Sequence, residues 1–272
     1  MTNEQELKRE LQAIQENHYA VPEDVDAYPY AQWMLDAIGS TDAELRDHLI
    51  YSTLAKWITN GVFREKELRG LLLQALSEDY LFYGIGEVGT NSVFKRAFSV
   101  LIPPLVLTVH KIKPFLSQEQ LYSVAEQILE YVYLEKDVRG YIEGKGWAHA
   151  TAHVADALYA LARSMHEREF AIELLRAVHY LIAKHDYVYI DGEDKRLANV
   201  IFAVYEKYIL STEEWKNWLC TFVSPKASRP QDSVLLQNVE TFIRTLYFRA
   251  EKESAYELKQ HILETLWELE GR

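Results

Sequence analysis

Cysteine is almost absent from this chain of 272 residues, in which Cys220 is the only one. A single thiol has no partner within the chain, so the sequence predicts no disulfide framework and does not imply an oxidising compartment. Cys220 lies in the apolar run 218–222, and free cysteine is among the residue types that are buried most often. We therefore expect a buried, unreactive thiol.

Positive charge is also scarce, because 29 lysines and arginines face 41 acidic side chains and the formal net charge is -12. A surface of this sign repels phosphate backbones and anionic lipid headgroups. We therefore expect neither nucleic acid nor a membrane as a partner.

Long apolar runs are missing as well. The most apolar stretch, 97–109, is shorter than the roughly 20 residues that span a bilayer, and Pro103 and Pro104 interrupt it. Residues 1–10 are polar and charged where a secretory signal needs an apolar core. The sequence predicts no transmembrane helix and a cytoplasmic location.

Alternating apolar and polar residues, the pattern of a half-buried strand, are rare; the best runs, 79–83 and 186–190, are brief and isolated. Helical periodicity is common instead. After Ser117, a stripe of apolar residues recurs at helical spacing, while Glu126 and Glu130 face away from it. The stripe consists of Leu121, Val124, Ala125, Ile128, Leu129 and Val132.

Helix start signals recur along the chain. Capping boxes are predicted at Thr2 with Gln5, Thr41 with Glu44, Ser117 with Gln120, and Ser211 with Glu214. The resulting helices lie near 2–17, 27–38, 42–60, 64–77, 91–112, 117–135, 146–166, 167–185, 194–210, 212–223, 231–250 and 253–269.

Three connections between these helices resemble one another. The runs 79–83, 137–142 and 186–190 each follow a predicted helix and lead through glycine into the next, with two predicted helices between neighbours. Self-similarity at about two helices per period is typical of α-solenoids, in which each helix pair buries its apolar face on the next. We predict an all-α fold: one domain over 1–272, a single curved stack of antiparallel helix pairs, HEAT-like or a related α/α superhelix. A chain of this length needs no cofactor to fold, and we assign none.

A dinucleotide-binding spacing occurs at Gly84, Gly86 and Gly89. That motif works inside a parallel sheet, with an acidic residue about 20 positions further on to bind ribose. Here that later region is an apolar helix containing Val109 and His110. We therefore predict a turning connection between helices and no nucleotide site.

The most informative stretch is 137–156, which contains His149 and His153. On a helix over 146–166, these histidines and Asp156 would point to one side. The opposite, mostly apolar face would carry Trp147, Val154, Leu158 and Leu161.

Two imidazoles at this spacing can hold one metal ion, with Asp156 as a third ligand and an open position for water. However, the glutamate that zinc peptidases carry between the two histidines is missing. Small residues such as Ala148 and Ala152 equally suggest a polar network in a packed groove. Network, ligand site and metal centre remain open alternatives, and no metal is assigned.

A further polar group, Asp186, Asp191, Glu193, Asp194, Lys195 and Arg196, does not have the spacing of a calcium-binding EF-hand loop. We interpret this group as a solvated turn followed by a capped helix start.

Three stretches, 45–53, 90–101 and above all 137–156 with Lys145, Gly146 and Trp147 at its centre, resemble the bacterial proteins known as domain of unknown function 2785. The resemblance covers nearly the whole chain. It implies a single helical domain without an established activity, so no catalytic residues carry over. After Arg96, where the family commonly has serine or threonine, this chain has Ala97.

Function is therefore predicted at the level of class. The first class is a scaffold or binding module whose concave groove takes a protein segment or a small molecule, with Asp137, Arg139, Lys145 and Trp147 as the predicted ligand-binding residues. The alternative is a hydrolase or lyase, with or without a metal ion. In it, His149 or His153 would act as base, Asp156 would orient that base or bind a metal, and Arg139 or Lys145 would hold an anion.

Overall fold

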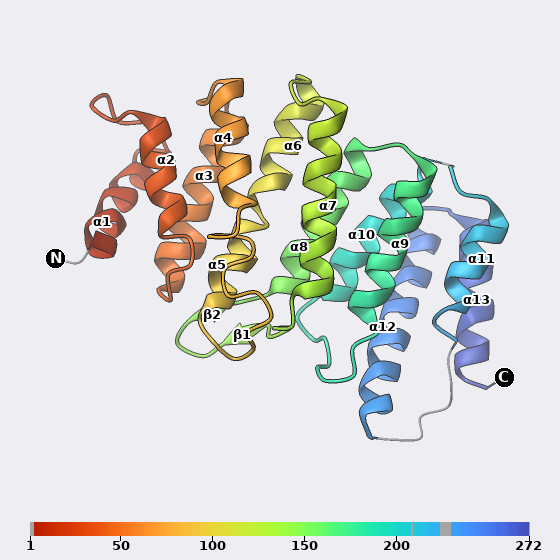
Figure 1. Ribbon diagram of the computed structural model, residues 1–272. Helices are drawn as coiled ribbons and strands as arrows, with labels where there is room; N and C mark the ends of the chain where they lie inside the picture. The colour runs from red at the N-terminus through yellow and green to blue at the C-terminus, as the bar shows by residue number, and fades with distance from the viewer. Residues whose placement is uncertain (1–2, 208, 224–229, 272) are drawn as a thin grey trace. The chain divides into compact units, whose positions relative to one another are not determined.

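The computed structural model describes residues 3–207, 209–223 and 230–271, and helices run through most of them (Figure 1). Among these residues the only strands are β1 (Tyr141–Ile142) and β2 (Gly146–Trp147), which form a two-stranded hairpin. The all-α prediction is confirmed. The stretches 79–83 and 186–190 form turns or irregular structure.

The chain forms two compact units, Met1–Leu161 and Ala162–Arg272, and the boundary falls within helix α8 (Ala150–Ser164). That residues 1–272 form a single domain stays a prediction. The first unit contains, besides the hairpin, α1 (Asn3–Glu16), α2 (Ala27–Asp36), the π-helix η1 (Glu44–Tyr51), α3 (Ser52–Thr59), α4 (Glu65–Ala75), α5 (Ser92–Ser99), α6 (Ile102–Ile112) and α7 (Gln118–Leu134). The second contains α9 (Arg168–Ile182), α10 (Glu193–Tyr205), α11 (Thr212–Cys220), α12 (Pro230–Lys252) and α13 (Tyr256–Leu269).

Two layers of helices enclose the core of the first unit. Helices α2 and α4 pack side by side in one layer, and α1 packs on η1 and α3 in the other (Figure 1). Helix α6 contacts both α3 and α4. Trp57 and Phe94 are among the largest side chains fully buried in this unit.

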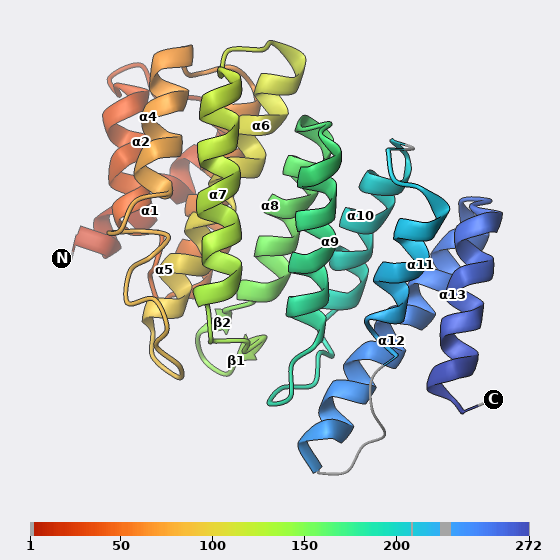
Figure 2. The same ribbon diagram turned by 45° about the vertical axis from the view of Figure 1, so that its right-hand side comes forward.

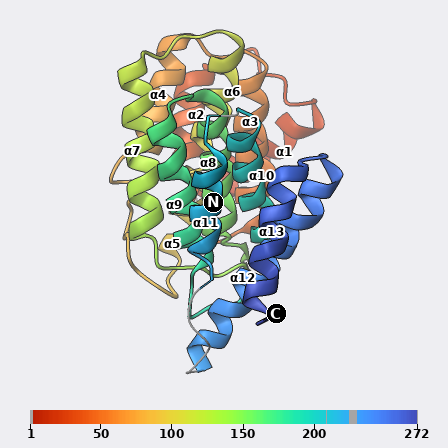
Figure 3. The ribbon, with the colours of Figure 1, turned by 90° about the vertical axis from the view of Figure 1, so that its right-hand side faces the viewer.

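The core of the second unit lies between consecutive helices. Helix α10 packs on α9 and α12, and α13 packs on α11 and α12 (Figure 2). Figure 3 shows α12 and α13 lying along one another. Phe202 and Phe242 are fully buried in this unit.

Local signals placed several helices correctly. Ser117 and Ser211 form the predicted reciprocal capping boxes with Gln120 and Glu214. The box predicted at Thr41 is wrong, because Asp42 supplies the side-chain oxygen that accepts from the Leu45 N–H; Thr2 lies outside the described residues. In α7 the predicted stripe is buried apart from Leu129, which is half-buried, and Glu126 and Glu130 are exposed.

The predicted helix 91–112 is divided in two. The helix hydrogen-bond pattern is interrupted at Val100 and Leu101, just before Pro103 and Pro104, because proline has no N–H to donate to the preceding turn. By length and composition alone Ser92–Ile112 could span a membrane, with a mean hydropathy of 1.5. However, 67% of its apolar window is buried inside the protein, as in the core helices of non-membrane proteins.

Cys220 is exposed, so the prediction of a buried thiol is wrong. Helix α11 turns Trp215, Trp218 and Leu219 toward the core. Cys220 lies one turn beyond the exposed Lys216 and shares its solvent-facing side.

A neutral histidine near the end of α6 holds the segment that follows this helix. The Nδ1 atom of His110 accepts hydrogen bonds from the N–H groups of Phe115 and Leu116, at 2.9 and 3.0 Å. Burial lowers the pKa of this imidazole from its ordinary value of 6.5. Protonation would place a hydrogen on a nitrogen that must accept, so the folded protein binds the proton less readily than the unfolded chain.

We therefore expect the free energy of unfolding to fall as the pH drops from about 6.5 through the lower pKa of folded His110. The variant His110→Asn keeps an acceptor oxygen but does not titrate, so it should lose part of this pH dependence. Urea unfolding at several pH values would measure the free energy of unfolding of each variant. His166→Asn is the control, because His166 is exposed. An unchanged pH slope in His110→Asn would contradict the assignment.

Candidate functional site

The hairpin β1–β2 occupies the stretch that the sequence placed partly in a helix. Tyr141 pairs with Trp147 and Ile142 with Gly146, and the two aromatic rings meet edge to face at 5.2 Å. Gly144 and Gly146 both have positive φ, a conformation that glycine adopts at little cost. Helix α8 consequently begins at Ala150, four residues later than predicted.

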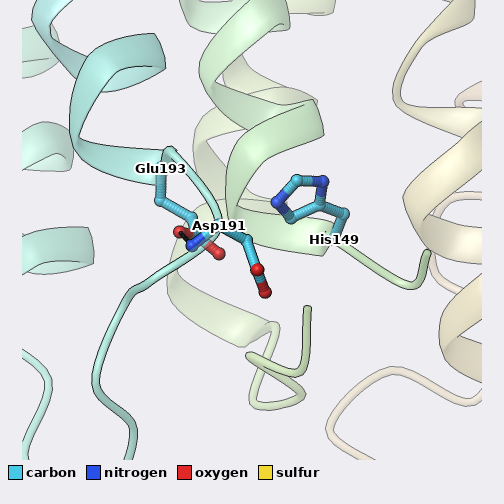
Figure 4. Close-up of side chains that lie close together, drawn as sticks. All are labelled: His149, Asp191 and Glu193. Atoms are coloured by element: carbon cyan, nitrogen blue, oxygen red, sulfur yellow. Dashed lines mark hydrogen bonds between the residues drawn. The ribbon is translucent and has the colours of Figure 1, made fainter. Parts of the chain in front are cut away.

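His149 is not helical, because its φ is +56°. Figure 4 shows its side chain where the loop enters α8. The ring of Trp147 stacks on the imidazole, with centroids 4.7 Å apart and planes at 21°. The prediction that Trp147 and His149 lie on opposite faces of one helix is therefore wrong.

His153 lies next to His149, and their ring centroids are 5.7 Å apart. The Nδ1 atom of His153 is 2.9 Å from the carbonyl oxygen of Ala97; since a carbonyl can only accept, Nδ1 carries the proton. Phe98 meets the same ring edge-on at 4.9 Å. Both histidines are buried and Asp156 is half-buried. A metal or catalytic role for these three residues stays a prediction.

Asp137 and Arg139 brace the glycine turn against the hairpin loop. The fully buried carboxylate of Asp137 accepts from the Gly89 N–H at 3.0 Å and pairs with Arg139. Arg139 also donates to the carbonyl of Thr90 at 2.7 Å. The turn at Gly84, Gly86 and Gly89, each with positive φ, is thus a connection between helices, as predicted.

Two fully buried arginines hold the loops in place. Arg46, on η1, donates to the carbonyl of Ser40 at 2.6 Å and to that of Lys145 at 2.8 Å. Its guanidinium also lies over the rings of Phe94 and Phe98.

Arg96, on α5, forms a two-pronged ion pair with Glu135 at 2.7 and 3.0 Å. It also donates to the carbonyls of Tyr83 and Gly84, at 3.0 and 2.9 Å. Although burial alone would lower the pKa of Arg96, the hydrogen bond and the charge of Glu135 raise it above its ordinary value. The charged form is therefore the one that binds these loops.

A cleft of about 620 Å³ lies between the segments that these arginines hold. Its lining includes Asp36, Ser40, Tyr83, Glu87, Asn91 and Lys95. The predicted residue Lys145 reaches its edge, because its Nζ atom donates to Oδ1 of Asn91 at 2.8 Å. Asp137, Arg139, Trp147, His149, His153 and Asp156 do not belong to the lining.

Among the residues that the structure describes, Lys95 is the only cation in the lining of this cleft. Its ammonium group lies over the rings of Tyr80 and Tyr83, at 4.6 and 5.1 Å from their centroids. A Cβ atom at Gly39 would lie 2.6 Å from the Lys95 Cβ. The absence of a side chain at Gly39 therefore makes room for Lys95. Within the described part of the chain, no carboxylate forms an ion pair with Lys95.

Residues 81–248 match the family described as "Protein of unknown function (DUF2785)". The chain belongs to the DUF2785 family. No curated protein and no solved structure is similar enough to the chain to count as a match. The residues matched to DUF2785 include Tyr83, Glu87, Asn91 and Lys95 of the cleft, together with Arg96 and the loop that contains Asp137 and His149.

The acidic side chains of the cleft in this DUF2785 protein already accept from hydroxyl groups. Ser40 donates to Glu4 at 3.1 Å, and Thr90 and Ser92 donate to Glu87 at 2.8 and 2.6 Å. The hydroxyls of Ser92 and Thr90 lower the pKa of Glu87. Asp36 accepts from the hydroxyl of Tyr80; burial, and then this hydrogen bond, raise the pKa of Tyr80 to about 12.

Sequence reasoning missed Lys95, Tyr83 and Asn91 as site residues. Lys95 and Asn91 do lie in the stretch 90–101 that supports the resemblance to DUF2785, but nothing in their spacing separates them from other polar residues of a helix. Their association depends on Arg96 and on the turn it binds, which only the tertiary structure reveals.

The acidic group in the second unit differs from its prediction as a solvated turn. Glu193 is almost fully buried at the start of α10, and its Oε2 accepts from the Asp191 N–H at 2.9 Å (Figure 4). Asp194 accepts from the hydroxyl of Thr245. Folding back onto its own turn takes the Glu193 side chain out of solvent.

Proposed function

We propose that this DUF2785 protein is a binding module whose cleft at Lys95 takes a small, hydroxyl-rich molecule with one negative charge, such as a sugar acid. The observation that carries the proposal is an ammonium group without an ion-pair partner among the described residues, in a cleft of about 620 Å³. That volume is in the range of pockets for small molecules, which are commonly about 300–1,000 Å³.

The surrounding charges leave room for at most one negative charge on the ligand. Lys95 binds the carboxylate of the ligand, whereas Glu4, Asp36 and Glu87 repel any further negative charge. The same carboxylates accept hydrogen bonds from hydroxyl groups, and each already does so from a side chain of the protein. Tyr83 is 49% exposed, and its ring offers an apolar face to the C–H groups of the ligand.

In this proposal the polar site around His149 and His153 has a supporting role: it holds α5, the helix that carries Lys95, in place. His153 binds the carbonyl of Ala97, and Arg46 joins the hairpin to Ser40 at the cleft. The hydrolase or lyase alternative stays a prediction. The cations it would use to hold an anion already have partners, Asp137 for Arg139 and Asn91 for Lys145.

The scaffold that carries the cleft is, in our proposal, a HEAT-like stack of antiparallel helix pairs in the cytoplasm. The support for the stack is that helices pack on their neighbours along the chain within a unit, as α2 packs on α4 and α4 on α6. An experimental structure of the full chain would test the stacking, and an extended sheet in it would contradict the proposal.

Replacing Lys95 with methionine keeps most of the apolar stem and removes the charge, so it should weaken the binding of D-gluconate at least about tenfold, the worth of one charged hydrogen bond. Isothermal titration calorimetry measures this effect. Sorbitol, which has the hydroxyls without the carboxylate, should bind more weakly than gluconate to the unaltered protein.

The matched control is Lys111→Met, because Lys111 is exposed and lies outside the cleft; its gluconate affinity should equal that of the unaltered protein. Failure of gluconate to bind, or equal affinity in Lys95→Met, would refute the proposal. Circular dichroism of both variants would establish that they are folded.

A further inference from the structure

A second cavity, of about 430 Å³, lies in the unit Met1–Leu161, between α1 and the loop that leads to α2. This volume is in the range of pockets for small molecules, about 300–1,000 Å³. The side chains that the argument below uses come from both helices and from the loop between them: Glu10, Ala13, Pro22, Asp24, Val25 and Tyr30. None of them lines the cleft at Lys95.

The walls of this cavity are held in place by the core. Tyr30 is buried, and its ring meets the ring of Trp33 edge to face at 5.4 Å. On the loop side, the indole N–H of the buried Trp57 donates to the carbonyl of Tyr19 at 2.8 Å. A site whose walls are already fixed loses little conformational entropy when a ligand binds.

Two carboxylates, Glu10 and Asp24, line the cavity, and neither forms an ion pair within the described part of the chain. Oε2 of Glu10 accepts from the hydroxyl of Tyr30 at 3.0 Å. Burial, and then this hydrogen bond, raise the pKa of Tyr30, so the phenol keeps its proton and donates.

The other oxygen of Glu10 is open to a ligand. Oε1 has no hydrogen-bond partner among the described residues, and it is not one of the buried side-chain atoms that lack a partner. The half-buried Glu10 therefore presents an accessible acceptor at the cavity. Because the lining contains no lysine or arginine from the residues that the structure describes, the charges favour a cation with N–H donors.

Apolar surface beside these carboxylates remains to be covered. Pro22 and Val25 are half-buried and Ala13 is exposed, and all three line the cavity. An apolar group that removes this surface from water gains binding free energy in proportion to the area covered. The ligand should therefore combine a positive charge with an apolar body.

We infer that this cavity binds a primary arylalkylammonium ion, such as 2-phenylethylammonium. An N–H of the ion donates to Oε1 of Glu10, Asp24 adds a second negative charge, and the aromatic ring covers Pro22 and Val25. The site is independent of the cleft proposed above, because the two linings share no residue.

Isothermal titration calorimetry of the full chain with 2-phenylethylammonium chloride tests the inference, and we expect saturable binding. The alcohol 2-phenylethanol has the same shape without the charge, so it should bind at least about tenfold more weakly. Ethylammonium keeps the charge and lacks the ring, so it should also bind at least about tenfold more weakly. All titrations are made at equal ionic strength.

Two variants on α1 form a matched pair. Glu10→Gln removes the charge but keeps an oxygen that accepts from Tyr30, and it should weaken binding of 2-phenylethylammonium about tenfold. Glu6→Gln changes the net charge equally, but Glu6 is exposed one turn earlier and outside the lining, so the affinity should not change. Gluconate binding should be the same in both variants.

Asp24→Asn is a second test at an exposed position of the loop, where the substitution should not disturb folding. It should weaken binding of 2-phenylethylammonium several-fold. Circular dichroism would establish that all three variants are folded. Absence of saturable binding, equal affinity for 2-phenylethanol, or unchanged affinity in Glu10→Gln or in Asp24→Asn would overturn the inference.

Discussion

Replacing Arg96 with methionine should lower the free energy of unfolding by about 3–5 kcal/mol, because it leaves the buried carboxylate of Glu135 without its counter-charge. The loss also removes the donor to the carbonyls of Tyr83 and Gly84. Urea unfolding followed by circular dichroism would measure the difference. A change comparable to that of an exposed ion pair would contradict the role assigned to Arg96.

A double variant separates charge from packing. Adding Glu135→Leu to Arg96→Met removes the unpaired charge, so the double variant should be more stable than the single one. Arg64→Met is the control, because Arg64 is 85% exposed in its ion pair with Glu67 and solvent screens such pairs. It should change stability little. The double variant should nevertheless not regain gluconate binding, because it still lacks the Arg96 hydrogen bonds to the turn that contains Tyr83.

Replacing Gly146 with alanine is expected to destabilise the protein by about 2–5 kcal/mol. About 1–2 kcal/mol comes from the positive φ of +77°. The remainder, about 1–3 kcal/mol, comes from overpacking, because the new Cβ would lie 2.7 Å from the Cβ of Ala43 and 3.1 Å from Nη2 of Arg46. Unfolding by urea measures the total.

Gly144→Ala provides the matched control in the same hairpin. Its φ is +73°, but no heavy atom lies within 4 Å of the added Cβ. It should therefore show only the conformational part, and the difference between the two variants reports the close packing of the hairpin on η1. Equal effects of the two substitutions would show that Arg46 does not hold the hairpin tightly.

The helices that the sequence predicted well are those whose start and period lie within a few residues. In α7, Ser117 and Gln120 cap one another and the buried stripe follows the helical repeat. These contacts are local, so a window of about one helix contains them. The two serine capping boxes and the helices that they begin were predictable for this reason.

The candidate site was predicted only in part. In the stretch 137–156, which the sequence singled out, β2 was read as the start of a helix and β1 as part of a connection, since β1 and β2 are only two residues long each. The hairpin is held by Arg46, which donates to the carbonyl of Lys145 99 positions away. A contact over that distance leaves no periodic signal in the sequence.

The burial of polar side chains was also not predictable from the sequence pattern. Nothing in the sequence marked Arg46 and Arg96 as buried, and Glu193 was interpreted as part of a solvated turn, yet all three are buried. The apolar setting of Cys220, in turn, concealed that it is exposed. Whether a polar side chain is buried depends on whether a distant loop provides its partners.

By itself, the sequence determined an all-α chain, its helix boundaries near capping residues, and a turn in place of a nucleotide site, because these depend on hydrogen bonds between neighbours along the chain. Only the tertiary structure decided that Lys95 faces a cleft, and that this lysine has no ion-pair partner among the described residues. Those properties arise from the sum of charges and donors that separate segments bring to one place.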